Sequence, residues 1–252
     1  MLNVWSRTDQ DFRKCRSCIA GNFQQLDPAA QRWTAQAEPS SIFAAAKLAA
    51  MRGWTVSKLD VKGAFLNAPL PEGELILVQP PAQWVAWGIV PKGVVWKLNR
   101  AVYGLRQSPK WWSDERDAQL SKLTLEVGSD TYYLEQNAAD SQVWCFRRRG
   151  HPAELHGLLC VYVDDFLIMV KDGPGRDQFL QSISKLWEFG KEKVLSPESP
   201  FTFLGLDWIQ RPDGSIYLMQ ERFTKELLEK HGMNQCKPAK SVTLDQIGRA
   251  HV

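Results

Sequence analysis

Three aspartates stand where they could hold divalent cations. Asp164 and Asp165 are adjacent and lie between two apolar runs, and a third acid, Asp60, closes a separate run of alternating residues. Burying an unpaired carboxylate is strongly unfavourable, so two acids inside an apolar hairpin need a positive partner. Hard oxygen ligands suit Mg²⁺ at a phosphoryl-transfer centre, where two ions lie about 3.5 to 4 Å apart. An exposed Asp-Asp turn without chemical meaning is the alternative.

One strand and two hairpins are predicted around these acids. Residues 55–61 alternate apolar and polar side chains, which predicts a half-buried strand that ends near Asp60. Residues 157–170 contain two partly β-branched apolar runs, which predict a β-hairpin with both acids at or beside its turn. Residues 201–209 and 215–219 flank a Pro-Asp-Gly sequence, which predicts a second hairpin.

Helices are predicted between these strands. Residues 39–52 are rich in alanine, with Ser40 and Ser41 as N-cap candidates and Gly53 placed to end the helix. Further helices are predicted over three ranges: 111–127, 176–189 and 220–231. Strands and helices mix without strict βαβ alternation, so an α+β fold is favoured over a doubly wound sheet.

The composition is that of a folded domain. The chain has 252 residues (28.7 kDa), 44% hydrophobic and 23% charged, which excludes a wholly disordered chain. The longest uncharged run, residues 75–91, is broken by Pro80 and Pro81, whereas a membrane span needs about 18 or more apolar residues. Five scattered cysteines and a charged N-terminus predict neither a disulfide framework nor a secretory signal. A reducing intracellular compartment, the cytoplasm, is therefore expected.

The net charge of +3 identifies no partner, but the charges are unevenly distributed. Residues 91–110 carry five basic and no acidic side chains, interleaved with aromatic rings. Basic residues among aromatics suit a phosphate backbone with bases stacked beside it. A solvated face whose aromatics belong to the core is the alternative. Cys15 and Cys18 form a C-x-x-C, but no second pair follows at a spacing that would complete a zinc site.

Four motifs follow one another along the chain: Asp60-Val-Lys-Gly-Ala-Phe65, Tyr103-Gly-Leu-Arg-Gln-Ser-Pro109, Tyr162-Val-Asp-Asp165 and Phe203-Leu-Gly-Leu206. In order and spacing they resemble the motifs of the reverse transcriptases of copia-type (Ty1/copia) LTR retrotransposons. The basic segment from Arg13 to Phe23 resembles the fingers strand that precedes them in that family. The resemblance covers about residue 13 to about residue 240.

The resemblance implies an α+β fold of the right-hand polymerase type, with a ferredoxin-like palm, partial fingers and the start of a thumb. The implied division is partial fingers (1–54), palm with the first catalytic strand (55–67), a fingers segment (68–107), palm with the Asp-Asp hairpin and a primer-grip-like hairpin (108–219), and the start of the thumb (220–243). Residues 244–252 are expected to be a non-native tail, because the sequence from Gln246 onward reads like a translated sequencing adapter.

The resemblance also implies a metal site. Asp60 and Asp164 would be the main ligands of two Mg²⁺ ions, with Mn²⁺ as an alternative metal. Asp165 would be the third carboxylate, and the backbone carbonyl of Val61 a further oxygen ligand.

The resemblance implies nucleotide contacts as well. Phe65 would lie under the incoming sugar and exclude a 2′-hydroxyl by steric clash, so deoxynucleotides would be favoured; core packing is the alternative role. Gln107 would contact the incoming nucleotide, with an ordinary loop amide as the alternative. Lys14 and Arg16 would grip its phosphates, with a solvated basic patch as the alternative.

The implied activity is RNA-directed DNA polymerisation, a nucleotidyl transfer that adds dNTPs to a primer 3′-hydroxyl. The partners would be an RNA template and a DNA or tRNA primer whose end is held at Leu204 and Gly205, with no membrane involved. Protease, integrase and RNase H domains would lie elsewhere in the polyprotein. The alternatives are a truncated, catalytically silent retroelement remnant that only binds template and primer, and a domesticated nucleic-acid-binding module.

Overall fold

The computed structural model describes residues 2–7, 13–24 and 33–236, and for residues 2–7 and 13–16 it describes the backbone alone. The chain divides into two compact units, Met1–Leu195 and Ser196–Val252. No helix in the described ranges is long and apolar enough to cross a membrane.

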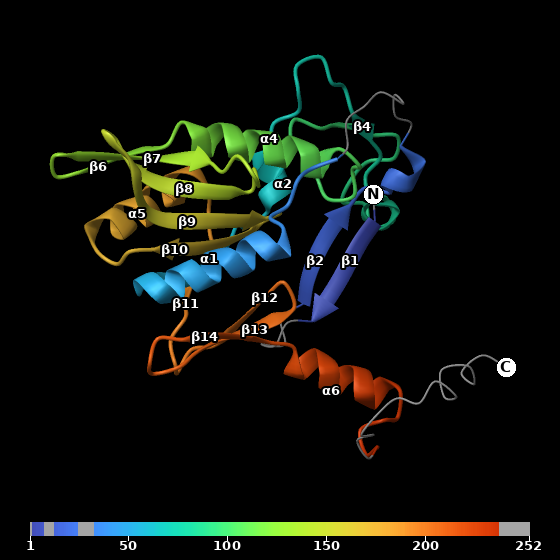
Figure 1. Cartoon of the computed structure of the whole chain (residues 1–252). Helices are drawn as coiled ribbons and strands as arrows, with labels where there is room; N and C mark the ends of the chain where they lie inside the picture. The colour runs from blue at the N-terminus through green and yellow to red at the C-terminus, as the bar shows by residue number, and fades with distance from the viewer. Residues whose placement is uncertain (1, 8–12, 25–32, 237–252) are drawn as a thin grey trace. The chain divides into compact units, whose positions relative to one another are not determined.

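A seven-stranded sheet forms the framework of the first unit (Figure 1). Its strand order is β11-β3-β10-β9-β8-β7-β6, and every neighbouring pair is antiparallel. The strands are β3 (Thr55–Asp60), β6 (Thr124–Val127), β7 (Asp130–Gln136), β8 (Val143–Arg148), β9 (His151–Tyr162), β10 (Asp165–Val170) and β11 (Lys193–Val194). This arrangement agrees with the predicted α+β class and with the predicted hairpin, since β9 and β10 are joined by a tight turn at residues 163–164.

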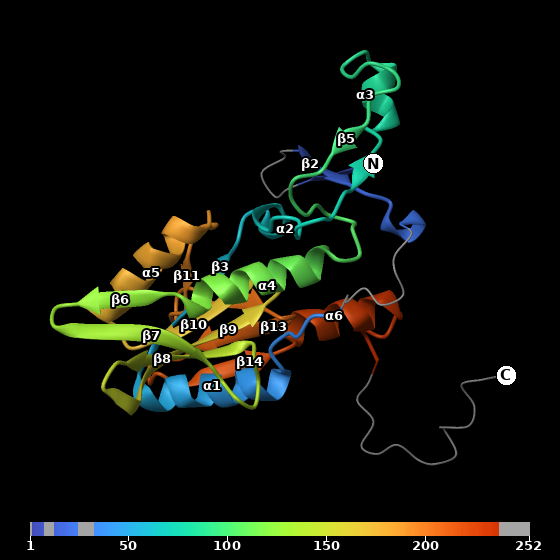
Figure 2. The same ribbon diagram turned by 90° about the horizontal axis from the view of Figure 1, so that it is seen from above.

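Three helices cover the two faces of this sheet (Figure 2). Helices α4 (Ser108–Ser121) and α5 (Pro174–Leu186) lie on one face, and α1 (Pro39–Arg52) lies on the other. The core between the sheet and the α4 and α5 helices contains the largest buried side chains of the unit, among them Trp112, Trp144, Phe166 and Phe179. Because β10 contacts α1 on one face and this core on the other, it is buried along nearly its whole length.

Helix α1 agrees with its predicted bounds. Ile42, Ala45, Ala46 and Ala49 are its buried residues, and they recur at the spacing of one helix face. Gly53 ends the helix in the left-handed conformation (φ 60°), as predicted. The predicted N-caps are wrong: Ser40 and Ser41 lie inside the first turn, behind Pro39, and the residue before the helix is Glu38.

The predicted helix over residues 111–127 is wrong at both ends. It begins earlier, at Ser108, and ends at Ser121, after which residues 124–127 form β6. Gly128 takes a left-handed conformation (φ 64°) in the turn that leads back into β7. The turn lets β6 pair with β7 and buries Leu125, a tertiary gain that outweighs helical propensity.

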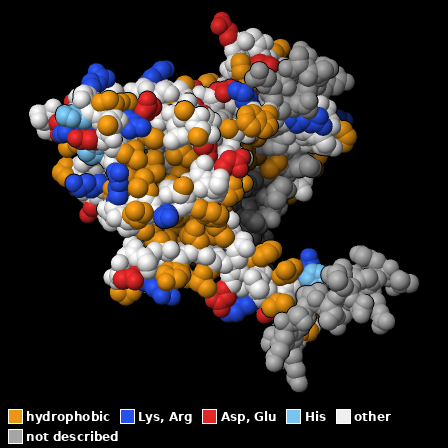
Figure 3. Space-filling model, viewed as in Figure 1, with side chains coloured by type: hydrophobic (Ala, Val, Ile, Leu, Met, Phe, Trp, Pro, Cys, Tyr) orange, Lys and Arg blue, Asp and Glu red, His pale blue; other side chains and the backbone are white. Residues whose placement is uncertain are grey.

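The face of the sheet beside α1 is only partly covered. A groove of about 370 Å³ lies between α1 and the strands β8 and β9, and Ala44, Leu48, Val143 and Leu158 line part of it. Figure 3 shows hydrophobic side chains gathered on this side of the molecule.

The first unit also contains several shorter elements outside this sheet and its three helices. They are β1 (Leu2–Arg7), β2 (Arg13–Cys18), the 3-10 turn η1 (Gly21–Phe23), α2 (Ala64–Asn67), β4 (Leu77–Val78), α3 (Ala82–Ala86) and β5 (Trp96–Lys97).

The second unit contains a three-stranded antiparallel sheet and one helix. These are β12 (Phe201–Phe203), β13 (Leu206–Gln210), β14 (Ile216–Met219) and α6 (Glu221–Lys230). The predicted hairpin around Pro-Asp-Gly is confirmed, because β13 pairs with β14. The prediction of one strand over residues 201–209 is wrong, since the chain reverses at Leu204 and Gly205 and forms an additional hairpin.

Candidate active site

The pairing of β3 with β10 brings the predicted acids together. Asp60, the last residue of β3, is the register partner of Asp165, the first residue of β10. The backbone N–H of Val61 donates a 2.9 Å hydrogen bond to the carbonyl oxygen of Asp164. Residues directly opposite in an antiparallel pair project to the same face of the sheet. All three acids therefore lie at the same end of the sheet, as the sequence predicts.

Asp165 has a cationic partner that the sequence analysis missed. The ammonium nitrogen of Lys58 lies 3.0 Å from a carboxylate oxygen of Asp165, and both side chains are about three-quarters buried. Lys58 stands two residues before Asp60, hence on the same face of β3. The two-residue spacing in a predicted strand could therefore have indicated that Lys58 lies beside the acids.

The predicted set of three carboxylate ligands is not gathered around one point in the structure. Within the described ranges, no group of three or more His, Cys, Asp or Glu side chains is gathered as a metal would require. Asp165 forms the ion pair with Lys58, and the backbone hydrogen bond from Val61 joins the end of β3 to the turn that contains Asp164. Hard oxygen donors of this kind suit Mg²⁺ or Mn²⁺.

The turn before Asp164 is held in an unusual backbone conformation. Val163 has a φ of 56°, which for a β-branched residue costs about 1–3 kcal/mol. Its carbonyl oxygen accepts hydrogen bonds from Trp112 Nε1 (2.8 Å) and Arg116 Nη1 (3.2 Å), both on α4. Burial lowers the pKa of Arg116, and Asp117 beside it opposes this shift; an arginine so placed stays charged. The sequence analysis missed both donors, although their spacing of four residues on a predicted helix places them on one face.

Phe65 lies on α2 and packs against the edge of the core. Its ring is half-buried, and its centroid lies 5.0 Å from that of Tyr103, with the two planes inclined by 59°. Tyr103 opens the second predicted motif, so the first and second motifs touch through these two rings. The packing is compatible with the predicted steric role and with the alternative of a core residue.

Gln107 precedes α4 and is buried. Its side-chain oxygen accepts a 2.6 Å hydrogen bond from Gln24 Nε2, and the Gln24 side-chain oxygen accepts one from the backbone N–H of Arg106. The backbones at Gly21 and Gly104 approach so closely that a Cβ on Gly21 would lie 1.9 Å from the Gly104 carbonyl oxygen. The segment after β2 is thus docked onto the second motif.

Four further residues were predicted to contact the nucleotide or the primer: Lys14, Arg16, Leu204 and Gly205. The side chains of Lys14 and Arg16 lie outside the described residues, although both positions belong to β2. Leu204 and Gly205 belong to the second unit, where both take left-handed conformations (φ 52° and 72°) in the two-residue turn between β12 and β13. Consecutive positive φ values are typical of the tight hairpin turns that favour Asn-Gly.

Two arginines and one tryptophan of the basic and aromatic segment over residues 91–110 make contacts within the protein. Arg100 Nη1 donates to the Asn67 carbonyl (2.9 Å) and Arg106 Nη2 to the Asn22 carbonyl (3.1 Å). Trp96 packs edge-on against Trp84, with ring centroids 5.8 Å apart. These contacts agree with the alternative in which the segment's aromatics serve packing.

Comparison with known proteins identifies the family. Residues 8–245 match the family model described as "Reverse transcriptase (RNA-dependent DNA polymerase)". Over 202 residues the chain is 32% identical to the retrovirus-related Pol polyprotein from transposon TNT 1-94 of Nicotiana tabacum, covering 79% of this chain and 14% of that protein. Over 190 residues it is 30% identical to the Pol polyprotein from transposon RE2 of Arabidopsis thaliana, covering 74% and 11% respectively.

A smaller relative and one solved structure are also similar. The putative transposon Ty5-1 protein of Saccharomyces cerevisiae is 26% identical over 184 residues, covering 71% of this chain and 51% of that protein. A telomerase structure from Candida albicans matches at 13% sequence identity, and the match covers 78% of this chain and 39% of the telomerase chain. Its TM-score of 0.30 is too low to support a conclusion on the fold. The chain spans only a small part of the polyproteins it matches. By the family match over most of its length, it belongs to the reverse transcriptase family of the Pol polyproteins of copia-type (Ty1/copia) transposons.

Proposed function

We propose that the chain is the core of an RNA-directed DNA polymerase that adds dNTPs to a primer 3′-hydroxyl. The observation that supports this most directly is the pairing of β3 with β10, which brings Asp60 beside the turn that contains Asp164. The partners that we propose are an RNA template and a DNA or tRNA primer, in the cytoplasm. The protease, integrase and RNase H activities would belong to other parts of the polyprotein.

Two Mg²⁺ ions are the proposed cofactors, with Mn²⁺ as an alternative. Asp60 and Asp164 would be the main ligands, and the Val61 carbonyl a further oxygen. Bound at such a site, the ions lower the pKa of the primer 3′-hydroxyl and stabilise the leaving pyrophosphate. Asp165 forms an ion pair with Lys58, so the Lys58 ammonium would lie beside the site before any metal binds.

The nucleotide would lie near the first and second motifs. Phe65, backed by Tyr103, offers a rigid aromatic surface that could exclude a 2′-hydroxyl. Gln107, oriented by its hydrogen bond to Gln24, would contact the nucleotide, and Lys14 and Arg16 would grip its phosphates.

We further propose the right-hand arrangement. The sheet that carries Asp60 would be the palm, and the segments around β1, β2, β4 and β5 would be the fingers. The hairpin at Leu204 and Gly205 would be the primer grip, with the thumb beginning at residue 220.

Primer extension tests the proposal. The purified chain is given an RNA template, a DNA primer, dNTPs and Mg²⁺, beside Asp164→Asn and Asp60→Asn. We expect extension by the wild type and a loss of about a hundredfold or more in each variant, because each removes a charged metal ligand. Asp172→Asn is the matched control, since Asp172 is exposed and follows the other end of β10.

Two outcomes contradict the polymerase. One is the absence of incorporation by a folded wild-type chain. The other is extension that Asp164→Asn leaves unchanged. If the wild type and Asp164→Asn bind template and primer equally well but neither extends, the chain is the silent remnant.

A further inference from the structure

A buried arginine lies beneath the turn that presents Asp164. Arg116 is 1% exposed and belongs to α4, on the opposite face of the sheet from α1. Its Nη1 donates a 3.2 Å hydrogen bond to the carbonyl oxygen of Val163, the residue directly before Asp164. Trp112 Nε1 donates to the same oxygen over 2.8 Å. The turn carbonyl is therefore held by two donors from one helix.

The turn needs such support because of its backbone. Val163 is in the left-handed region, and a valine side chain provides no local hydrogen bond that would favour this conformation. Strained conformations of this kind persist only where the surrounding structure fixes them. Since Asp164 directly follows, rotation at Val163 would change the direction in which its carboxylate leaves the turn.

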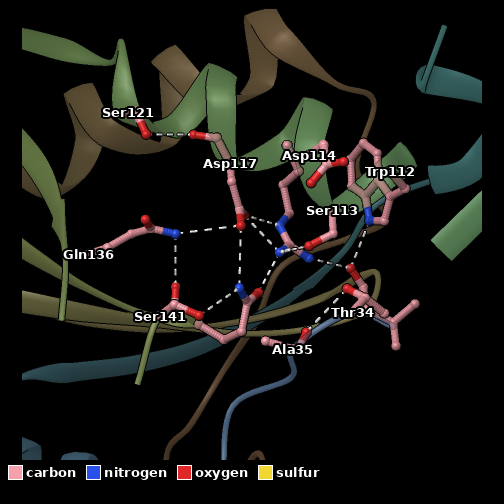
Figure 4. Close-up of polar contacts among 12 residues, drawn as sticks. Thr34, Ala35, Trp112, Ser113, Asp114, Asp117, Ser121, Gln136 and Ser141 are labelled. Atoms are coloured by element: carbon pink, nitrogen blue, oxygen red, sulfur yellow. Dashed lines mark hydrogen bonds and ion pairs between the residues drawn. The ribbon is translucent and has the colours of Figure 1, made fainter. Parts of the chain in front are cut away.

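The rest of the guanidinium is fixed as well. Arg116 Nε and Nη2 donate to Asp117 Oδ1 over 2.9 and 2.7 Å, and Nη2 also donates to Ser113 Oγ over 3.1 Å and to Gln142 Oε1. Figure 4 shows Trp112, Ser113 and Asp117 of α4 directed toward this network. A planar group with five donors can make these contacts together, whereas a lysine ammonium cannot.

The network also reaches the strand before the turn. Gln142 is 2% exposed, its Nε2 donates to Asp117 Oδ2 over 3.3 Å, and its carbonyl oxygen accepts a 2.9 Å hydrogen bond from the Val161 N–H. Gln136 adds contacts to Asp117 and to the Ser141 carbonyl (Figure 4). The guanidinium and its partners thus connect three parts of the structure: α4, the loop that precedes β8, and strand β9. Together these parts support the turn.

We propose that Arg116, with Trp112, is a positioning residue that fixes the Val163 carbonyl and thereby orients Asp164 toward the metal. The inference rests on the proposed function, in which Asp164 is a metal ligand. It assigns a role in the site to residues on the covered face of the sheet.

The test compares Arg116→Lys with Trp112→Phe, which keeps an aromatic ring and removes one donor. Arg176→Lys is the matched control, because Arg176 is also a buried arginine, on α5, and it pairs with Glu192 away from the turn. Two quantities are measured: the affinity for Mn²⁺ by electron paramagnetic resonance, and amide hydrogen exchange in residues 160–168. Thermal unfolding and template-primer affinity are measured alongside.

We expect Arg116→Lys and Trp112→Phe to weaken Mn²⁺ binding about tenfold or more and to speed exchange at the turn. Arg176→Lys should change neither quantity, even if it lowers the unfolding temperature as much. If Arg116→Lys does not fold, Trp112→Phe decides by the same measurements.

The inference is overturned if both variants bind Mn²⁺ and exchange at the turn like the wild type, or if Arg176→Lys gives the same changes. A wild type that binds Mn²⁺ through Asp164 but extends no primer contradicts the proposed function and leaves this inference standing. If the wild type binds no Mn²⁺, the exchange comparison alone decides whether Arg116 holds the turn.

Discussion

The ring of Phe65 lies against the ring of Tyr103, with centroids 5.0 Å apart and planes inclined by 59°. The contact joins the short helix after β3 to the loop before α4, two segments that are distant in sequence. Phe65 is therefore supported from behind, and its exposed side keeps a fixed position. A side chain so supported can act as a steric barrier, because it cannot turn aside without losing its aromatic contact.

Phe65→Ala should increase the use of ribonucleotides. Removing the ring opens space for a 2′-hydroxyl, and the discrimination between dNTPs and rNTPs should fall about tenfold or more. Single-nucleotide primer extension with each substrate measures the ratio of kcat/KM values. Tyr103→Leu should give a smaller loss, since Phe65 remains but is less firmly held. Robust extension with unaltered discrimination in Phe65→Ala would show that the ring only packs.

Lys58→Gln should strengthen metal binding while weakening the fold. Removing the ammonium takes away a positive charge that competes with a cation for Asp165. Two unit charges a few ångströms apart in water interact by about 1 kcal/mol, so we expect about a fivefold gain in Mn²⁺ affinity. The free energy of unfolding should fall by about 1 kcal/mol, because Asp165 loses its partner. Lys62→Gln is the control, since it removes an equal charge from an exposed pair with Glu188. Equal effects of both variants on Mn²⁺ affinity would contradict a specific role for Lys58.

Gly21→Ala should undock the segment that follows β2. The new methyl group would lie 1.9 Å from the Gly104 carbonyl oxygen, a distance that backbone movement alone can relieve. We expect a loss of about 2 kcal/mol or more in the free energy of unfolding, measured by urea denaturation. In Gly175→Ala the nearest atom would be 3.8 Å away, so that variant should be neutral or slightly stabilising. Similar stabilities for the two variants would argue against the docking.

Leu204→Asn should stabilise the hairpin between β12 and β13. Leucine pays a conformational cost at a φ of 52°, whereas asparagine tolerates the left-handed region and suits the position before Gly205. A gain of about 1 kcal/mol is expected, and limited proteolysis of the second unit would detect it as slower cleavage. Faster cleavage would show that the leucine side chain contributes more by packing than its backbone costs.

Cys160 should resist alkylation in the folded protein. Burial raises the pKa of its thiol well above the usual range, so the reactive thiolate is scarce near neutral pH and remains so as the pH rises toward 9. Cys236 is exposed and should react readily. Iodoacetamide labelling followed by peptide mass spectrometry distinguishes the two. Labelling of Cys160 without denaturant, at a rate similar to Cys236, would contradict the burial of β9.

The sequence predicted the local elements whose signals are strong. Helix α1 has its alanine-rich face and its terminal Gly53, and the β9–β10 hairpin has two apolar runs around the acids. Strands β7 and β8 were not predicted. β7 contains charged and aromatic residues and is mostly half-buried, so its alternation is weak, and its pairing depends on the turn at Gly128.

For the candidate site, the placement of the three acids at one end of the sheet could be predicted, but the contacts that support the turn could not. Sequence motifs identify Asp60 and Asp164, and the register of β3 and β10 agrees with them. The hydrogen bonds from Trp112 and Arg116 to the Val163 carbonyl depend on how α4 lies across the sheet. Such contacts arise from tertiary packing, which local patterns do not encode. The roles of the three acids as metal ligands stay predictions. The same holds for the roles of the nucleotide-binding and primer-grip residues: Lys14, Arg16, Val61, Phe65, Gln107, Leu204 and Gly205.

The pairing of β3 with β10 also determines when the site can form during synthesis. Asp60 and its partner Asp165 are 105 residues apart (165 − 60), and the other neighbour of β3, β11, comes later still. A ribosome adds those residues in roughly 5–20 s, and for that time β3 has neither neighbour. An unpaired strand edge is prone to associate with other chains. The acids therefore come together only after β10 has emerged from the ribosome. Nascent chains that stop before Val170 would expose the unpaired, aggregation-prone edge of β3 and would not form the site.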